Sequence, residues 1–224
     1  MPATDRSHDV YAALRDQIVR GDMPAGTVLS ESEIAAAMSV SRTPVRQAVA
    51  RLRRDGLLHQ PPGRSAVVTA VSAETAVELY QAREALEPYA LTLVARSRER
   101  DHFTSLAGSF NELASADRID LDDLHALSRE FDAQVRKRCG NGYIARLLEE
   151  LSVHTARLRM LARGDQDRLH ASARQRSAIA HAVARGDGPE AARLEAARLS
   201  DSLAVVLREL LGTTVGIHRG EPIA

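Results

Sequence analysis

Apolar residues recur at helical spacing along almost the whole chain. Val10, Leu14 and Ile18 repeat every four residues and predict a first helix over about 7–20. From residue 72 onward the same period continues in segments at about 72–98, 101–115, 120–138, 142–163, 166–185 and 188–211. Polar or glycine-containing breaks separate these segments. The C-terminal region is therefore predicted to be an all-α helical bundle.

The N-terminal region has the start and stop signals of two short, successive helices. Ser30 and Glu33 form a capping-box pattern, in which the serine hydroxyl satisfies a backbone N–H group of the first turn. Ser41 can cap the following helix, and Pro44 lies in its first turn, where a missing N–H costs little. Gly56 ends that helix. This pattern predicts a helix-turn-helix.

Two short apolar, β-branched runs follow the second of these helices. Residues 57–60 and 65–71 flank a turn sequence at 61–64 and predict a β-hairpin, which would be the wing of a winged helix-turn-helix. The expected fold is mainly α, with a winged helix-turn-helix domain over 1–71, an all-α helical domain over 72–212 and a mobile C-terminal tail over 213–224.

Composition restricts the class of protein more than it identifies the function. The formal net charge is zero and 44% of residues are hydrophobic, so the chain can bury a substantial core. Cys139 is the single cysteine and excludes an intrachain disulfide. The N-terminus lacks the apolar core of a signal peptide, and no apolar run reaches the length of a membrane span. We expect a soluble, cytoplasmic protein with no membrane partner.

Positive charge is concentrated on the helix that follows Ser41. This helix carries five arginines, at 42, 46, 51, 53 and 54, with no acidic residue before Asp55. Arg42, Thr43 and Arg46 fall opposite its apolar stripe, near its N-terminus. A helix in the major groove reads base edges with its N-terminal residues, and arginine can bind guanine through two hydrogen bonds.

The remaining candidates for nucleic-acid contact lie on both sides of these arginines. The hydroxyl groups of Ser41 and Thr43 suit phosphate oxygens, and the wing places Gly63 and Arg64 where they could enter a minor groove. The arginines at 51, 53 and 54 are expected to touch the DNA backbone or solvent. The alternative is that the N-terminal helices expose a solvated arginine face and serve protein contacts alone.

The run from Val40 to Arg46, together with Leu52 and Asp55-Gly56-Leu57-Leu58, resembles the winged helix-turn-helix signature of GntR-type bacterial transcription regulators. The resemblance covers about residues 8–70 and implies a homodimer that binds a short palindromic operator. By motif position it assigns DNA contacts to Ser41, Arg42, Thr43, Arg46, Gly63 and Arg64. The chain has Ser32 where the family often has arginine, and Ser39 where it often has glycine.

Three segments of the helical region resemble the FadR-type effector domain, the all-helical FCD class. They are Tyr80–Ala90, Leu127–Asp132 followed by Cys139-Gly140-Asn141, and Ser177–Asp187. Many members of that class hold a divalent metal through an aspartate, a histidine four residues later and two further histidines. The corresponding positions here are Ser128, Asp132, Arg176 and Arg198. Because a guanidinium does not deprotonate and repels a cation, we expect no metal at this site and no cofactor.

Arginines at these positions suit an anionic ligand. Arg176, Arg198 and Arg83 could clamp a carboxylate or phosphate, with Ser128 and Asp132 in the same pocket. His154 lies near the apolar face of its helix and could also line the pocket. The alternative is that Asp132 pairs with one arginine as an internal ion pair that closes the bundle.

These observations favour a homodimeric, DNA-binding transcription regulator, expected to be a repressor, controlled by a small effector that bears a carboxylate or phosphate. No catalytic motif is present, so an enzyme is not expected. Two alternatives stay open: a metal-responsive regulator with unusual ligands such as Asp132 and His154, and a helical enzyme with a DNA-binding appendage. Whether the effector releases or strengthens DNA binding also stays open.

Overall fold

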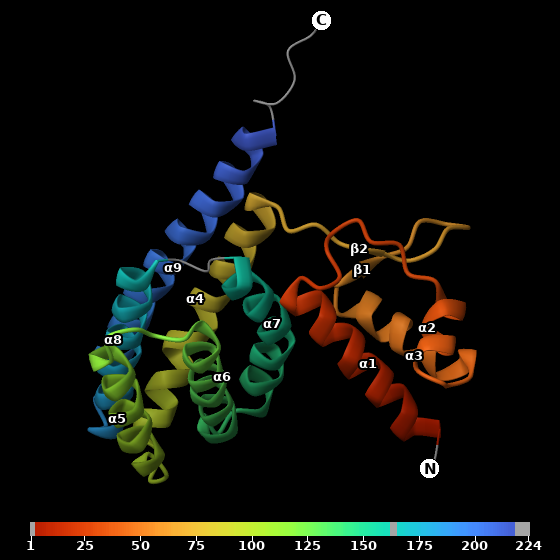
Figure 1. The fold of residues 1–224 in the computed structure, drawn as a ribbon. Coiled ribbons are helices and arrows are strands. Elements are labelled where there is room, and N and C mark those ends of the chain that lie inside the picture. Colours follow the sequence, from red (N-terminus) through yellow and green to blue (C-terminus); the bar gives the residue numbers. More distant parts are fainter. Residues whose placement is uncertain (1–2, 162–164, 218–224) are drawn as a thin grey trace, which may run out of the picture. The chain divides into compact units, whose positions relative to one another are not determined.

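The computed structural model describes residues 3–161 and 165–217, and the chain divides into two compact units between Ser72 and Ala73. Helices dominate both units, and the described strands form one two-stranded hairpin in the first (Figure 1). The mainly α fold class predicted from the hydrophobic period is confirmed. None of the helices within the described ranges is long and apolar enough to cross a membrane.

The first unit is a three-helix core with a short hairpin. Its elements are α1 (Ala3–Arg20), α2 (Glu31–Ala37), α3 (Arg42–Arg54), β1 (Leu58–His59) and β2 (Val67–Val68). Helix α1 packs on α3 because the apolar stripe of α1 meets Val45, Val49 and Leu52, all of which are buried. The strands pair antiparallel with Leu58 opposite Val68.

Local signals in the sequence explain the turn between α2 and α3. The Ser30 hydroxyl accepts a hydrogen bond from the Glu33 backbone N–H at 3.4 Å, as the capping-box pattern predicts. Ser39 has φ of 53°, in the left-handed region that glycine adopts most readily. This is the turn position at which the resembling family often has glycine, so the serine adopts the conformation that the turn requires.

The second unit is a bundle of long helices. They are α4 (Ala73–Arg96), α5 (Asp101–Ser115), α6 (Leu121–Arg138), α7 (Gly142–Leu161), α8 (Gln166–Ala184) and α9 (Gly188–Ile217). Helix α5 packs on α8, and α4 packs on α9. In the core, the Phe131 ring meets the Phe103 and Phe110 rings edge to face, with centroids 5.4 and 6.2 Å apart.

The last helix is longer than the sequence pattern indicates. It continues to Ile217 instead of ending near residue 211, because Gly212 is accommodated within the helix and no proline follows until residue 222. The first part of the expected tail is therefore helical. The rest of that tail, residues 218–224, lies outside the described residues.

Candidate functional site

The residues predicted to contact DNA share an exposed face of the first unit. Ser41, Arg42, Thr43 and Arg46 are all exposed at the start of α3, whereas Pro44 and Val45 face the core. Ser41 occupies the N-cap position, but its side chain makes no cap hydrogen bond. Its hydroxyl is therefore available to an external acceptor or donor such as a DNA phosphate.

The wing and the start of α3 line a common cleft of about 400 Å³. Arg42 from α3, Gly63 and Arg64 from the wing, and Ser30 and Ser32 from α2 line it. The wing turn is closed by a hydrogen bond from the Arg64 backbone N–H to the Pro61 carbonyl, 3.1 Å long. Ser32 was not among the predicted contacts, because the family often has arginine there, but it lines the same cleft, with its hydroxyl 3.0 Å from the Ser30 hydroxyl.

Two arginines of α3 have partners within the first unit. The Arg46 Nε atom lies 3.6 Å from a Glu31 carboxylate oxygen, and the Arg46 side chain is 72% exposed. Further along the helix, the Arg51 guanidinium stacks 3.8 Å from the centroid of the Tyr11 ring. The Tyr11 hydroxyl donates to Asp55 at 2.7 Å, and burial together with that carboxylate raises the pKa of Tyr11. Arg51 thus covers a tyrosine that joins α1 to the end of α3.

The second unit buries arginines in the middle of its bundle. Arg83 on α4, Arg176 on α8 and Arg198 on α9 are 1%, 2% and 4% exposed. Burial of an ionised guanidinium is costly unless carboxylates and hydrogen bonds compensate it. The three side chains therefore need partners from neighbouring helices.

Three carboxylates supply most of these partners. The Arg83 Nε atom donates to Glu87 at 2.7 Å. Arg198 pairs with Glu195 through its Nε atom at 2.9 Å and lies 3.4 Å from Glu87 through Nη2. Asp132 accepts from Arg176 Nη1 at 2.9 Å and from Arg159 Nη2 at 2.7 Å. The internal ion pair of Asp132, which the sequence left as an alternative, is present and involves two arginines.

Burial and charge shift the pKa values of this network in different directions. Burial would raise the pKa of Asp132, but Arg159 and Arg176 hold it well below its usual range. Burial raises the pKa of Glu87, and the charge of Glu195 adds to the rise. Burial and the nearby Arg198 lower the pKa of Arg176 to about 10. Asp132 is thus firmly ionised, whereas Glu87 binds a proton more readily than a free glutamate.

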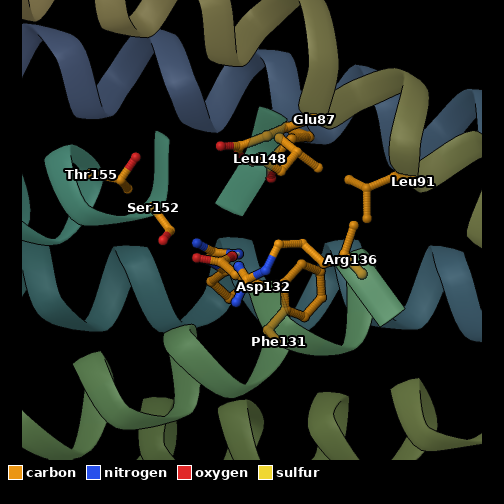
Figure 2. A pocket seen from close by; sticks show the side chains of 11 residues that line it. Glu87, Leu91, Phe131, Asp132, Arg136, Leu148, Ser152 and Thr155 are labelled. Carbon is orange, nitrogen blue, oxygen red and sulfur yellow. The ribbon is translucent and has the colours of Figure 1, made fainter. Parts of the chain in front are cut away.

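Residues of this network line two small chambers. The first, which we call the acidic chamber, has a volume of about 30 Å³. Figure 2 shows Glu87 from α4, Asp132 from α6, and Ser152 and Thr155 from α7 around its space, with Phe131 and Leu148 forming apolar wall. Its three carboxylates are those of the ion-pair network, Glu87, Asp132 and Glu195.

The second chamber, which we call the arginine chamber, has a volume of about 60 Å³. Its wall carries five guanidinium groups, one imidazole, one phenol, three serine hydroxyls and four aliphatic side chains. These are Arg83, Arg159, Arg168, Arg176, Arg198, His125, Tyr80, Ser128, Ser172, Ser202, Leu121, Leu124, Leu169 and Val205. No aspartate or glutamate is among these described lining residues.

Arg176 lines both chambers. Its guanidinium stacks 4.9 Å from the centroid of the Phe131 ring, and its Nη1 atom is held by Asp132. Its Nη2 atom is buried and has no hydrogen-bond partner within the described part of the chain. An unsatisfied charged donor of this kind is rare in native interiors and points to a missing acceptor.

The structure brings together most, but not all, of the residues predicted for the effector pocket. Arg83, Ser128, Arg176 and Arg198 line the arginine chamber, whereas Asp132 lines the acidic chamber. His154 is half-buried on α7 and is not among the residues described as lining either chamber. On that helix Ser152, Thr155 and Arg159 share the inward face, and position 154 is rotated away from it.

Five residues of this region were not predicted from the sequence: Arg159, Arg168 and His125 in the arginine chamber, and Glu87 and Glu195 in the ion-pair network. The sequence does contain a pattern that could have identified several of them: polar residues recur at helical spacing within the apolar face of a helix. On α8 the spacing is Arg168, Ser172, Arg176, and on α6 it is His125, Ser128, Asp132. A search for inward polar residues would have found these rows.

A divalent metal does not fit the four positions at which the resembling family binds one. Asp132 is the one carboxylate of the set, and two guanidiniums already occupy its oxygens. Arg176 and Arg198 cannot coordinate a cation. Within 3–161 and 165–217, no group of three or more histidine, cysteine, aspartate or glutamate side chains is arranged to hold a metal ion. The donor chemistry present instead favours an anion.

Each of the two units matches a known protein-family model. The model of the bacterial regulatory proteins of the gntR family matches residues 6–68, and the FCD domain model matches residues 78–202. A transcriptional regulator from an unstable DNA locus of Streptomyces ambofaciens is 27% identical over 181 residues, which are 81% of this chain and 76% of that protein. A probable D-xylose utilization operon repressor of Paenarthrobacter nicotinovorans is 30% identical over 150 residues, 66% of each chain.

Solved structures share the fold at lower identity. A GntR regulator from Rhodococcus sp. RHA1 superposes with a TM-score of 0.74 at 24% identity, covering 91% of this chain and 98% of that one. Escherichia coli McbR/YncC superposes with a TM-score of 0.76 at 18% identity, with the same coverage. The family consists of transcription regulators, not enzymes. The chain therefore belongs to the GntR family of DNA-binding transcription regulators and carries a C-terminal FCD domain.

Proposed function

We propose that this regulator is a homodimeric repressor whose operator affinity is set by a compact anion bound in the arginine chamber. The observation that carries the proposal is a chamber wall of five guanidiniums with no carboxylate among its described lining residues. One of these guanidiniums, that of Arg176, has a buried Nη2 atom without a hydrogen-bond partner in the described part of the chain. Relatives described as repressors, including the gluconate operon repressor of Bacillus licheniformis, support the direction of regulation.

Charge counting favours an anion in this chamber. Arg83, Arg159, Arg168, Arg176 and Arg198 carry five positive charges. Four negative charges act on them: the three carboxylates of the acidic chamber and Asp201, which acts on Arg168. Arg136 lines the acidic chamber but is left out of this count, because it pairs with a separate glutamate of α7. Arg168 hydrogen-bonds only to neutral partners among the described residues, a serine at 3.1 Å and a glutamine at 3.4 Å. An anion in the chamber would neutralise the remaining positive charge.

Size restricts the anion to a compact one. A cavity of roughly 10–15 Å³ holds one water molecule, so about 60 Å³ accommodates a few waters or an oxyanion of similar bulk. Phosphate, sulfate and short dicarboxylates are of this class. A larger metabolite requires the arginine side chains to move aside.

Anion binding can be coupled to the bundle through Arg176. This side chain joins α8 to α6 through Asp132, and Arg159 joins α7 to the same carboxylate. An anion that engages Arg176 competes with Asp132 for its donors and changes how these three helices are held together. A ligand shifts such an equilibrium only by its difference in affinity for the two states.

On the DNA side, we propose that Ser41, Arg42, Thr43 and Arg46 contact the major groove and its phosphates, and that Gly63 and Arg64 contact the adjacent minor groove. The exposure of all six residues supports this assignment. Two such units in a homodimer would address half-sites about one helical turn apart. Sedimentation of the complex with a duplex of one and of two half-sites tests the stoichiometry.

The proposed function is tested by titrating the full chain with phosphate at constant ionic strength. Calorimetry measures anion binding, and retention of an operator duplex selected from a random library measures the DNA response. We expect phosphate to bind with about one site per chain and to lower operator affinity. Absence of phosphate and dicarboxylate binding, or operator binding that does not change when the chamber is occupied, would overturn the proposal.

Two arginines of α8 provide a matched pair of variants. Arg168→Gln removes a chamber cation that has no carboxylate partner within salt-bridge distance among the described residues, so the ion-pair network is kept. Arg174→Gln removes an exposed arginine from the same helix. We expect the first variant to lose about tenfold or more in anion affinity, the value of one charge-assisted hydrogen bond, and the second to bind as wild type.

A further inference from the structure

One wall residue of the arginine chamber carries an imidazole, the side chain whose unperturbed pKa is about 6.5. His125 lies on α6, is 8% exposed and lines the chamber among the five guanidiniums. None of the described carboxylates lies within salt-bridge distance of its ring. A buried imidazole without an acidic partner and surrounded by cations is held in its neutral form.

Three charged groups act directly on this ring, and further cations from the other helices line the same chamber. On its own helix they are Arg129 and Asp122, and α7 contributes Arg159. Across the chamber stand Arg168 and Arg176 of α8, Arg198 of α9, and Arg83 with Tyr80 of α4. Burial first, and then the charges of Arg159 and Arg129, lower the pKa of His125 to about 4.

We propose that His125 is a further ligand of the chamber's anion and takes up one proton as the anion enters, so that the effector binds more tightly as the pH falls. The proton comes from solvent, and no bond of the effector changes. An anion among the arginines cancels the repulsion that keeps the ring neutral, and an imidazolium N–H is a stronger donor to it than a neutral one. This inference rests on the proposed function, because it needs an anion in the same chamber.

Sulfate is the suitable probe because it stays a dianion between pH 5 and pH 8, so any proton taken up belongs to the protein. Calorimetric titration of the full chain at pH 6 in two buffers of different ionisation enthalpy counts the protons. We expect close to one proton per bound sulfate, and sulfate affinity that rises by up to about tenfold per pH unit as the pH falls from 7 to 5.

The variants are His125→Gln and, as a control, His102→Gln on the exposed face of α5. We expect His125→Gln to bind sulfate with lower affinity, without proton uptake and with little pH dependence, while His102→Gln behaves as wild type. Proton uptake that persists in His125→Gln overturns the inference. So does sulfate binding by the wild type without proton uptake.

A direct measurement keeps the test independent of how well the variant folds. The ring resonances of His125 in the wild-type protein report its protonation with and without sulfate. We expect them to titrate at higher pH when sulfate is bound, and identical titration curves overturn the inference. Binding of neither sulfate nor phosphate at any pH contradicts the proposed function itself, which is a different outcome from binding without a proton.

Discussion

In the DNA-binding unit Arg42, Arg46 and Arg64 stand exposed at a surface, whereas Arg83, Arg176 and Arg198 of the bundle are at most 4% exposed and tied to carboxylates. The same side chain therefore meets two different environments in one protein. At the surface its charge is hydrated, and we propose that it serves contacts with phosphates and base edges. In the bundle carboxylates compensate most of the charge, and we propose that the remainder binds an anion.

The comparison shows that the effect of replacing an arginine depends on whether water or a buried carboxylate compensates its charge. An exposed guanidinium is hydrated and screened, so we expect its loss to cost little stability but, at the proposed DNA surface, to remove a contact with DNA. Removal of a buried guanidinium leaves the negative charge of its carboxylate partners uncompensated in an environment of low polarity. Substitutions in the two units should therefore separate effects on binding from effects on folding.

The largest effect is expected from Arg198→Met in the centre of the bundle. The variant leaves Glu195, which is 1% exposed, and Glu87 without their shared cation. We expect the free energy of unfolding to fall by about 3–5 kcal/mol, as measured by chemical denaturation.

A matched control lies one and a half turns earlier on the same helix. Arg193 pairs with Glu190 at the same spacing as Arg198 with Glu195, but the Arg193 side chain is 66% exposed. We expect Arg193→Met to leave the denaturation midpoint nearly unchanged, because exposed ion pairs contribute little. Equal losses in the two variants would show that burial does not distinguish the two pairs.

A second prediction concerns stability between pH 6.5 and pH 4. The pKa of His125 is lowered to about 4 in the folded state, so across this range the unfolded chain binds a proton that the folded chain does not. Above pH 6.5 the ring is neutral in both the folded and the unfolded chain, so His125 adds no pH dependence there. As the pH falls from 6.5 toward 4, the free energy of unfolding should decrease by up to about 3 kcal/mol. Denaturation of wild type and His125→Gln at each pH measures the difference.

The comparison of the two proteins isolates the histidine. Glu87 has a raised pKa and acts with the opposite sign as the pH falls, but it is present in both proteins. If the two curves of unfolding free energy against pH run parallel, His125 is not the group responsible. Saturating sulfate should flatten the wild-type curve, because the bound anion favours the protonated ring.

The smallest effect on stability, with a clear effect on binding, is expected at the DNA surface. Arg46→Ala should weaken operator binding by about 1–3 kcal/mol, or roughly tenfold to a hundredfold, and relax the preference at one base pair. Arg53→Ala, from the exposed C-terminal turn of the same helix, serves as the control. Mobility-shift titrations at fixed salt measure both. Similar losses in the two variants would indicate a general charge effect instead of groove reading.

Much of the fold could be predicted because local signals agree with the tertiary structure. The capping box at Ser30, Pro44 in the first turn of α3 and Gly56 after its end predict elements that the structure contains. Helix boundaries in the bundle match to within a few residues except at the end of α9, where the chain stays helical past Gly212. Helix propensity tolerates one glycine when no proline or capping motif follows.

The effector site could be predicted only in part. Motif resemblance placed Ser128, Asp132, Arg176 and Arg198 in one region, and the structure brings them together around two chambers. It did not indicate that Arg198 pairs with Glu87, 111 positions away in the sequence. Nor did it indicate that His125, and not His154, faces the arginine chamber.

The sequence was enough to predict the class of protein and the arginine-rich second helix of its helix-turn-helix, because these depend on local period, caps and residue identity. Its resemblance to the FCD class indicated that arginines stand at two of that class's metal-ligand positions. The tertiary structure alone decided which charges meet. That choice depends on the rotation of each helix about its axis and on its distance from its neighbours, which local periodicity constrains only to within a face. The pairing of four chamber arginines with three carboxylates, and the uncompensated charge that remains, are therefore properties of the packed bundle.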